Sequence, residues 1–526
     1  MADQLTLGRR GLLAGAGGAV GLYSLGQRRA RPVAAAPQRL PRDDPFTLGV
    51  ASGDPSPDGV VLWTRLAPEP LAEDGHGGMP PQPVAVRYEV ATDEHFRAIV
   101  RRGTAPARAE FAHAVHVELD GLLPHRWYWY RFRLGAHVSP TGRTRTLPEP
   151  GAQPAALPFA FVSCQDWQTG YYTAYRHLAA EDLDLVVHLG DYIYEYASYG
   201  PDYPRPQPGT EPGDDSIRTL AEYRNRYALY RTDADLQAAH RAFAWVTTLD
   251  DHEVQDSWAD ETNLQVPPSA FRDQRAAALR AYYEHMPLRR RALPQGPDMR
   301  LYRRVAYGDL ATFNVLDTRQ FRAAPACGGG RLSDCDERWD PARSLPGAEQ
   351  ERWLHAGLAD AETRWNVLAQ QVFFSQWAMD GDPELFSMDA WDGYASSRER
   401  VLRTVTEAPV PNFIVLTGDI HLNIAADIKA DFTDPDSATL GSEFAGTSVS
   451  SAGDGTDLPW WAPTDLQTNP HFAFINGQRG YVRCHVTRGR WRSDYRVVPY
   501  VSTPGAPVST RRSFVVEAGH PGLQEV

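Results

Sequence analysis

The pattern of hydrophobic and polar positions changes once along the chain, at a linker rich in Pro, Gly and Ala that covers residues 148–154. Before it, from Phe46 to Leu147, short runs of β-branched and aromatic residues alternate with turn signals such as Asp120-Gly121 and Thr141-Gly142. Runs of this composition, bounded by such turns, are typical of β-strands. We therefore expect residues 43–148 to form an N-terminal β-sandwich of fibronectin type III character with a structural role.

After the linker, short apolar runs alternate with amphipathic stretches such as Leu220–Tyr230, which predicts an α/β domain over residues 155–526. Four of the apolar runs end in residues that can bind metal ions. These groups are Cys164, Asp191, Asp250–Glu253, and Asp419 with His421. In α/β sheets, the loops at the carboxyl ends of the strands converge. The four groups are therefore expected to meet at one site, although they lie far apart in the sequence.

Each of these groups is a weak signal by itself. A Gly-Asp pair at a strand end is usually a turn or a helix cap. Cys164 alone suits a buried apolar thiol, and His188 is expected to be a core residue. Tyr194, three residues after Asp191, is either a phenol at the site or one of several packing aromatics. The prediction of a metal centre rests on the four strand-end groups taken together.

Composition and charge exclude several classes of protein. The 526 residues are 42% hydrophobic and 23% charged, which excludes a wholly disordered chain and allows two or three domains. The formal net charge is −13 and no run of residues is strongly basic, so no stable nucleic-acid complex is expected. Four cysteines are too few for a disulfide scaffold. Cys327 and Cys335 either close a disulfide in an oxidising compartment or form a metal-binding loop, and Cys484 is expected to be a buried free thiol.

The first residues have the features of a targeting signal. Arg9-Arg10 precede a glycine-rich apolar run without charge, and Ala34–Ala36 offer a cleavage site of small residues. Residues 1–36 are thus expected to be a twin-arginine signal peptide, read by the twin-arginine export machinery, with the mature protein in the periplasm, in the cell envelope or secreted. The alternative is an irregular N-terminus without a signal. No later apolar run reaches about 18 residues, so no transmembrane segment is expected in the mature chain.

Six motifs resemble those of the PhoD-type alkaline phosphatases, which are calcineurin-like metallophosphoesterases related to the purple acid phosphatases. The motifs are Ser163–Trp167, His188–Tyr196, Asp250–Val254, Leu316–Gln320, Gly418–His421 and Gly480–Arg483. The resemblance covers nearly the whole chain. It implies that residues 155–526 form a metallophosphatase domain, with sheets flanked by helices, that hydrolyses phosphomonoesters and some phosphodiesters at alkaline pH. The implied substrates are small phosphate esters, and we expect a monomer.

The resemblance also implies Fe3+ and Ca2+ as cofactors, one ion of the first kind and two of the second. The implied ligands are Cys164, Asp191, Tyr194 and His421 for Fe3+, and Asp251 and Asp419, with Asp191 as a bridge, for Ca2+. The hard Ca2+ ion needs several oxygen ligands, which carboxylates supply. Cations at such a site neutralise charge at phosphorus and generate hydroxide for in-line attack. No serine is placed as a nucleophile with a partnered base.

Two further residues receive roles in the reaction. His252 is expected to hydrogen-bond the phosphoryl group or to protonate the leaving alkoxide. Arg289 is a candidate phosphate clamp, with a surface arginine at a helix end as the alternative. The family often has Asn-Asn shortly after the D-D-H-E-V motif, whereas this chain has Asp256-Ser257. The extra carboxylate is expected to alter calcium affinity or to repel a dianionic substrate.

Two other functions remain open at the level of the sequence. An exported phosphodiesterase, or an enzyme resembling phospholipase D, would use the same fold and phosphoryl site on teichoic acids, nucleic-acid fragments or phospholipids. A non-catalytic secreted metal-binding adhesion protein would need closed coordination shells, without an open position for phosphate. The relative turnover of a monoester and a diester separates the two enzymes, and a phosphate-release assay with metal analysis tests the third possibility.

Overall fold

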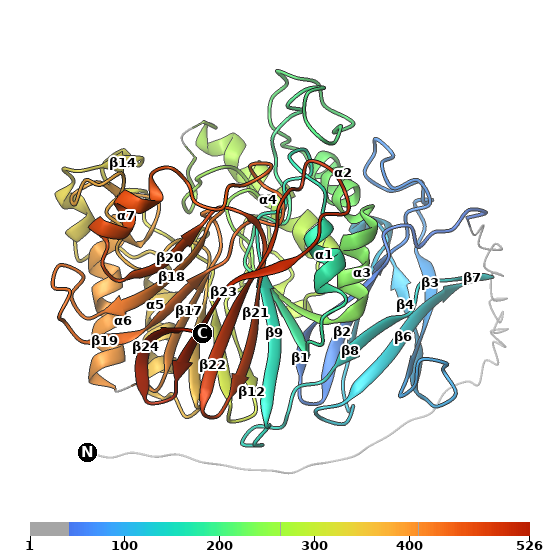
Figure 1. The fold of residues 1–526 in the computed structure, drawn as a ribbon. Coiled ribbons are helices and arrows are strands. Elements are labelled where there is room, and N and C mark those ends of the chain that lie inside the picture. The colour runs from blue at the N-terminus through green and yellow to red at the C-terminus, as the bar shows by residue number, and fades with distance from the viewer. Residues whose placement is uncertain (1–40, 264, 409) are drawn as a thin grey trace, which may run out of the picture. The chain divides into compact units, whose positions relative to one another are not determined.

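The structure, a computed structural model, describes residues 41–263, 265–408 and 410–526. These residues belong to one compact unit of mixed α/β structure, in which two large sheets carry helices (Figure 1). The predicted signal peptide, residues 1–36, lies outside the described residues. Within the described part of the chain, no helix has both the length and the apolar character needed to cross a membrane.

A ten-stranded sheet forms the centre of the unit. In spatial order its strands are β24 (His520–Glu525), β23 (Ser509–Glu517), β22 (Arg490–Val498), β21 (Arg479–Thr487), β9 (Ala156–Val162), β10 (Leu185–His188), β11 (Ala244–Thr247), β1 (Val50–Ser56), β2 (Gly59–Arg65) and β5 (Ala114–Leu119). The central strands β9, β10, β11 and β1 are parallel, and the outer strands pair antiparallel. Every residue of β10 and β11 is buried, as expected for parallel strands covered on both faces.

A second sheet of seven strands packs against the first. In spatial order its strands are β12 (Arg303–Tyr307), β13 (Ala311–Val315), β15 (Trp365–Ala369), β17 (Phe413–Thr417), β19 (Thr439–Ala445), β18 (Asn423–Lys429) and β20 (Phe472–Asn476). The core between the two sheets includes Phe159, Val187, Phe313 and Leu416. Successive side chains of a strand point to opposite faces, so Val187 faces the second sheet while Val186 faces the helices.

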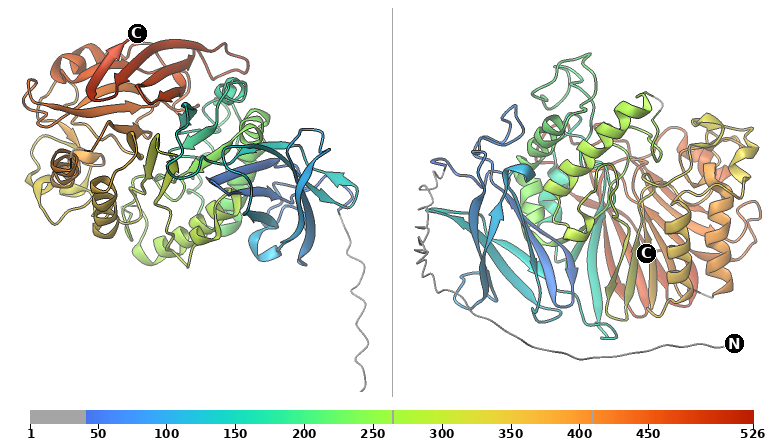
Figure 2. Two further views of the ribbon diagram at one scale, coloured as in Figure 1. Left: turned by 90° about the horizontal axis from the view of Figure 1, so that it is seen from below. Right: turned by 180° about the vertical axis from the view of Figure 1, so that it is seen from behind.

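Helices cover the outer faces of both sheets (Figure 2). Those on the first sheet are α1 (Thr173–Leu178), α2 (Leu220–Arg231), α3 (Ala234–Ala242) and α4 (Pro268–His285). Those on the second sheet are α5 (Ala348–Ala359) and α6 (Ala395–Glu407), and α7 (Ala462–Thr468) packs beside β20. Helix α2 begins at a capping box formed by Thr219 and Glu222, and the Asp233 side chain caps α3. These caps satisfy backbone N–H groups that lack partners in the first turn.

Several further elements are short and lie in the connecting loops. They are the 3-10 helices η1 (Ala109–Phe111), η2 (Arg290–Ala292), η3 (Ala326–Gly328), η4 (Asp336–Trp339) and η5 (Trp391–Tyr394), and a two-stranded sheet of β14 (Arg331–Leu332) and β16 (Phe386–Ser387). Cys327 and Cys335 are joined by a disulfide between η3 and η4, with their Cα atoms 6.1 Å apart. The metal-binding alternative for this pair is therefore not adopted.

The N-terminal segment forms strands that are divided between two sheets. A smaller sheet holds β4 (Ile99–Ala107), β3 (Val84–Ala91), β6 (Trp127–Leu134), β7 (His137–Val138) and β8 (Gly142–Arg145). It shares a core with β1, β2 and β5 that includes Val60, Leu62, Val86 and Tyr130. Because β1 pairs with β11, no structural break separates this segment from the α/β part. A period-two pattern identifies strands without specifying their partners, and the fibronectin type III topology stays a prediction.

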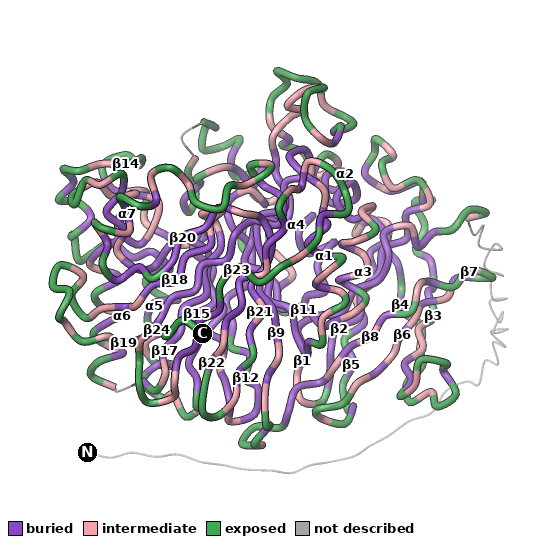
Figure 3. Tube along the Cα trace, in the orientation of Figure 1, coloured by how far each residue is buried: buried purple, intermediate pink, exposed green. Residues whose placement is uncertain are grey.

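The carboxyl ends of the central strands carry the loops of the candidate site. Cys164 follows β9, Asp191 follows β10, Asp250 follows β11 and Asp419 follows β17. Of the strands that lead to these loops, β10, β11 and β17 are buried along their length, and β9 is buried from Phe159 to Val162 (Figure 3). The buried strands thus hold four loops whose side chains can bind metal ions.

Candidate metal centre

The backbone at the strand ends adopts an unfavourable conformation. Cys164, Asp191, Asp419 and His421 have φ angles of 60°, 56°, 60° and 55°, in the left-handed region. This conformation costs a residue other than glycine roughly 1–3 kcal/mol, and it persists where the surrounding structure enforces it. Such residues are concentrated at functional sites. The four turns therefore support a shared function for these residues.

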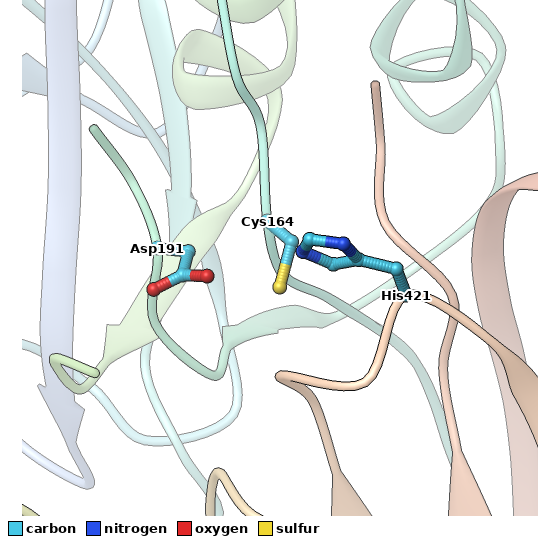
Figure 4. Close-up of side chains that lie close together, drawn as sticks. All are labelled: Cys164, Asp191 and His421. Carbon is cyan, nitrogen blue, oxygen red and sulfur yellow. The ribbon is translucent and has the colours of Figure 1, made fainter. Parts of the chain in front are cut away.

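The side chains at the strand ends form three adjoining groups of possible metal ligands, within each of which one atom per residue lies within 4.8 Å of the others. The groups are Cys164 with Asp191 and His421, Asp191 with Asp251 and His252, and Asp250 with Asp251 and Asp419. Figure 4 shows the first group, whose side chains come from three loops and point toward one another. Because Asp191 and Asp251 are each shared between two groups, the three groups form one continuous cluster.

Tyr194 joins the first group through its hydroxyl. The hydroxyl donates to Asp191 Oδ2 at 2.9 Å and lies 3.0 Å from His421 Nε2, and the Ser451 hydroxyl donates to it at 2.8 Å. Tyr194 thus contacts two of the predicted ligands rather than packing apart from them. The structure brings together all six residues predicted as metal ligands, and their ligand role is taken up below as a proposal.

Buried oxygen atoms of the cluster lack hydrogen-bond partners. Asp191 Oδ1 and Asp250 Oδ2 have none in the described structure, and Asp251 Oδ1 has only an ion pair with Arg319 at 3.5 Å. Buried polar atoms are nearly always paired, so each exception requires a reason. A bound cation is a sufficient reason, because it takes carboxylate oxygens as ligands. The residues present therefore fit a metal centre.

The electrostatics of the cluster point the same way. Burial, together with Asp251, Glu253 and Asp419, raises the pKa of Asp191 well above its usual range, although His252 opposes the shift. Burial and neighbouring carboxylates likewise raise the pKa of Asp419 to about 6, against the effect of Arg319. Burial and Asp191 raise the pKa of the Cys164 thiol. Adding positive charge would favour the ionised forms of all three groups.

The two histidines differ in protonation. Burial, Arg479 and His252 lower the pKa of His421 to about 3, so its imidazole is neutral, the form that binds metals. For His252, burial opposes protonation, but Glu195, Asp251 and Asp191 outweigh it and raise the pKa well above the usual range. A nearly buried His252 therefore carries a proton at neutral pH beside the cluster.

Sequence reasoning missed the residues that hold His252 and the loops in place. Glu195 is fully buried, and its Oε2 lies 2.8 Å from His252 Nδ1. The His252 ring also stacks on Tyr194, with ring centroids 4.2 Å apart. Glu253 accepts hydrogen bonds from the backbone N–H groups of Asp191 and Asp250 at 3.1 and 2.7 Å, so it ties the β10 loop to the β11 loop. The signal was present, since both glutamates lie inside the quoted motifs.

A second missed residue is Arg319, which the sequence places only in the Leu316–Gln320 motif after β13. Its guanidinium is completely buried and forms ion pairs with four aspartates. They are Asp250, Asp251, Asp389 and Asp419. Arg322 also contacts Asp389, at 2.7 Å. Arg319 therefore brings positive charge to the centre from the second sheet, in addition to that of His252 on the first.

The structure does not bring Arg289, the predicted phosphate clamp, to the cluster. Its Nη2 donates to Ser56 Oγ at 2.8 Å and its Nε to the Asp54 carbonyl at 3.2 Å, at the end of β1. No contact links Arg289 to the cluster among the described residues. The segment after α4 runs beside β1, so the guanidinium is used to attach it there. Arg319 is the arginine that lies at the centre.

The remaining predicted positions have structural contacts. Asp256 accepts hydrogen bonds from the hydroxyls of Tyr196 and Ser257, both at 2.7 Å. The Ser257 backbone N–H donates to Asp251 Oδ2 at 2.7 Å, so this turn supports a cluster residue. The effect of Asp256 on calcium or substrate stays a prediction. His188 is buried in the core beside Trp245, and Cys484 is a buried free thiol.

Comparisons with known proteins cover nearly the whole chain. Two family models match it, "PhoD-like phosphatase, N-terminal domain" over residues 32–148 and "PhoD-like phosphatase" over residues 159–495. The chain is 51% identical over 532 residues to alkaline phosphatase D of Bacillus subtilis (strain 168), with 99% of this chain and 89% of that protein covered. It is also 51% identical to a solved structure described as that of PhoD, with a TM-score of 0.89 and 93% of each chain covered.

Proposed function

This chain belongs to the PhoD-like phosphatase family, and from that premise we propose that it is an exported alkaline phosphatase with a centre of one Fe3+ and two Ca2+ ions. The family and the 51% identical relative make it a phosphoric ester hydrolase. The metals, the preference for phosphomonoesters and the export route are the parts that this proposal adds.

The observation that carries the metal assignment is the donor set of the three adjoining ligand groups. The first group, extended by Tyr194, offers a thiol, a phenol, an imidazole and a carboxylate, a set that suits Fe3+. The other two groups offer mainly carboxylate oxygens, which suit Ca2+ better than zinc. We assign Cys164, Asp191, Tyr194 and His421 to Fe3+, and Asp191, Asp251 and Asp419 to Ca2+, with Asp250 as an additional oxygen ligand.

When bound, these cations neutralise phosphoryl oxygens and lower the pKa of water for attack at phosphorus. The residues around the cluster determine the side from which the substrate reaches it. The side chains of Asp419 and Asp389 are 26% and 28% exposed, so solvent reaches the cluster on the side where Arg319 lies. Arg319 is held by four carboxylates in a fixed orientation there. An open side of this kind distinguishes a catalytic centre from the closed coordination shell of an adhesion protein.

His252 supplies the proton for the leaving group. Glu195 holds Nδ1, which leaves Nε2 as the nitrogen directed at the substrate. Glu195, Asp251 and Asp191 raise the pKa of His252 well above its usual range, which favours the protonated imidazole that the leaving alkoxide needs. Stacking on Tyr194 fixes the ring, so the proton is held in one position before substrate arrives.

Metal analysis combined with a phosphate-release assay on the purified protein tests this function. We expect iron and calcium in the preparation, loss of activity with a calcium chelator, and recovery when Ca2+ is added back. Iron should stay bound through this treatment. Full activity after exhaustive chelation and dialysis would contradict the calcium assignment. Turnover of para-nitrophenyl phosphate in excess of its bis ester would establish the monoester preference, and the reverse would favour the phosphodiesterase.

A further inference from the structure

A cationic cavity lies apart from the metal cluster, at the start of β12. It has a volume of about 380 Å³, and its walls include Arg291, Arg300, Arg303 and Arg304 but only one carboxylate, that of Asp54. In a chain with a formal net charge of −13, four arginines around one cavity reverse the local charge. Among the described residues, none forms an ion pair with Arg291, Arg300 or Arg304. The cavity therefore presents uncompensated positive charge.

Arg303 adds a hydrogen-bond donor without an acceptor. It is more than nine-tenths buried, and its Nη2 bonds Asp54 Oδ1 at 2.6 Å and the Thr247 carbonyl at 3.0 Å. Its Nε, by contrast, has no hydrogen-bond partner. A buried N–H without an acceptor is costly, because it has lost water and gained nothing in return. An anionic ligand in the cavity would provide the missing acceptor.

Two of the other arginines are held in place by aromatic rings. The Arg304 guanidinium lies over the Trp353 ring at 4.1 Å, and its Nε donates to Asn314 Oδ1 at 2.9 Å. The Arg300 guanidinium lies over the Tyr302 ring at 4.9 Å. Stacking of this kind reduces the freedom that an arginine loses when it binds a ligand. The cavity is thus partly preorganised for an anion.

An adjoining cavity of about 580 Å³ shares Arg291, Arg300 and Tyr302 with the first. Its walls include the apolar side chains of Leu293, Met299 and Phe321. They also include three carboxylates, each with a partner of its own: Asp260 and Asp298 pair with Arg275 at 3.8 and 3.9 Å, and Glu349 accepts from the Tyr302 hydroxyl at 3.0 Å. Ligand sites in proteins are typically about 300–1,000 Å³ in volume and mainly apolar, with a few polar groups that fix orientation. The pair of cavities offers both parts, a cationic end and a partly apolar end.

We propose that these two cavities form a second binding site, for a phosphorylated organic molecule. The phosphoryl group accepts from Arg303 Nε and from the guanidinium groups of Arg291 and Arg300, a geometry in which arginine is favoured. The organic part lies against Leu293, Met299 and Phe321. The residues of this site are absent from the three ligand groups of the metal cluster, so the site is additional to the catalytic one and does not depend on the proposed function.

Calorimetric titration of the holoenzyme with phenylphosphonate tests the proposal, because its C–P bond resists hydrolysis. We expect two sites in the natural protein and the loss of one, at least tenfold in affinity, in the double variant Arg291→Glu/Arg300→Glu. The matched control is Arg290→Glu, an exposed neighbour that does not line either cavity, and it should keep both sites. Arg303→Lys, which retains charge but removes Nε, should weaken the same site.

Three results would overturn the proposal. One is a single site in the natural protein that the double variant leaves unchanged. Another is a loss of phenylphosphonate binding in the control variant equal to that in the double variant. The third concerns the double variant: phenylphosphonate keeps its dissociation constant at the second site but becomes a weaker competitive inhibitor of phosphatase activity. This result would place the arginines at the catalytic site.

Inorganic phosphate should bind the second site about tenfold more weakly than phenylphosphonate. Equal affinities of the two ligands would show that the organic part does not contribute to binding.

Discussion

At the scale of single residues, burial raises the pKa of an acid, a thiol and a phenol of the candidate centre, those of Asp191, Cys164 and Tyr194. Burial and Asp191 raise the pKa of Tyr194 well above its usual range, so calcium is too weakly polarising to displace its proton. A ferric ion is a strong enough Lewis acid to bind the phenolate. The thiol of Cys164 faces the same constraint. Binding of metal to this cluster is therefore expected to release protons.

Tyr194→Phe tests the ferric assignment. A phenolate or thiolate on Fe3+ gives charge-transfer absorption in the visible range, so the natural protein should be coloured and the variant should shift or lose that band. Activity should fall by at least about 10–100-fold, because the loss of a residue that only supports a metal ligand already costs that much. Visible absorption and phosphate release are the measurements.

Tyr192→Phe is the matched control, because its buried hydroxyl contacts His240 at 2.8 Å and not the cluster. It should leave the spectrum unchanged. A colourless, iron-free and fully active natural protein would remove Tyr194 and Cys164 from the set of ligands.

Glu195→Gln tests the role of His252 as proton donor. Glu195 raises the pKa of His252, so removing its charge should lower that pKa. The proton is then lost at lower pH, and the alkaline limb of the kcat profile should move to lower pH while the acid side changes little. A purely structural role for Glu195 would instead reduce kcat equally at every pH.

At the scale of secondary-structure elements, the sequence indicated the strand ends well and the connections between layers poorly. Cys164, Asp191 and Asp419 follow apolar runs directly, so parallel strands were enough to predict that they meet. Arg319 reaches the same centre from the second sheet, and its motif alone does not reveal which sheet carries it. Arg289 was assigned from its residue type, but its contacts with β1 depend on how the segment after α4 packs.

Helices α5 and α6 offer a test of such a connection through Glu351. Its carboxylate on α5 accepts from Arg400 and Ser397 on α6 and from Ser344. Burial opposes ionisation, but hydrogen bonds from His355, Arg400 and Ser344 lower the pKa of Glu351 to about 2. Because the folded-state pKa lies below the unfolded value of about 4.3, the stabilisation is present above that value and is lost as pH falls toward 2.

Glu351→Gln should therefore lower the free energy of unfolding at pH 7, by about 1–3 kcal/mol. The difference from the natural protein should shrink as pH falls below about 4.3. Urea unfolding at several pH values measures it, with Glu399→Gln as an exposed control on α6. A difference that stays constant down to pH 3 would show that Glu351 acts through packing rather than through its charge.

At the scale of the whole molecule, the proposed function requires the chain to leave the cytoplasm. Replacing Arg9 and Arg10 with lysine should leave precursor in the cytoplasm, because the twin-arginine machinery reads that pair. Cell fractionation and the mass of the exported protein measure this, and cleavage is expected after about Ala36. Normal export of the variant would contradict the twin-arginine assignment.

The position of β1 in the ten-stranded sheet has a consequence for the order of folding. Strand β1 pairs with β11, and β9 pairs with β21, so each of these pairings waits until a segment distant in the sequence has been synthesised, which for β21 is near the end of the chain. Pairing between segments so distant in sequence closes large loops before it gains contacts, which makes folding slow. Until β11 emerges from the ribosome, β1 is an unpaired strand edge that can associate with other chains. The proposed twin-arginine route, which carries folded proteins, would suit such a chain, since it would let the sheet close before transport.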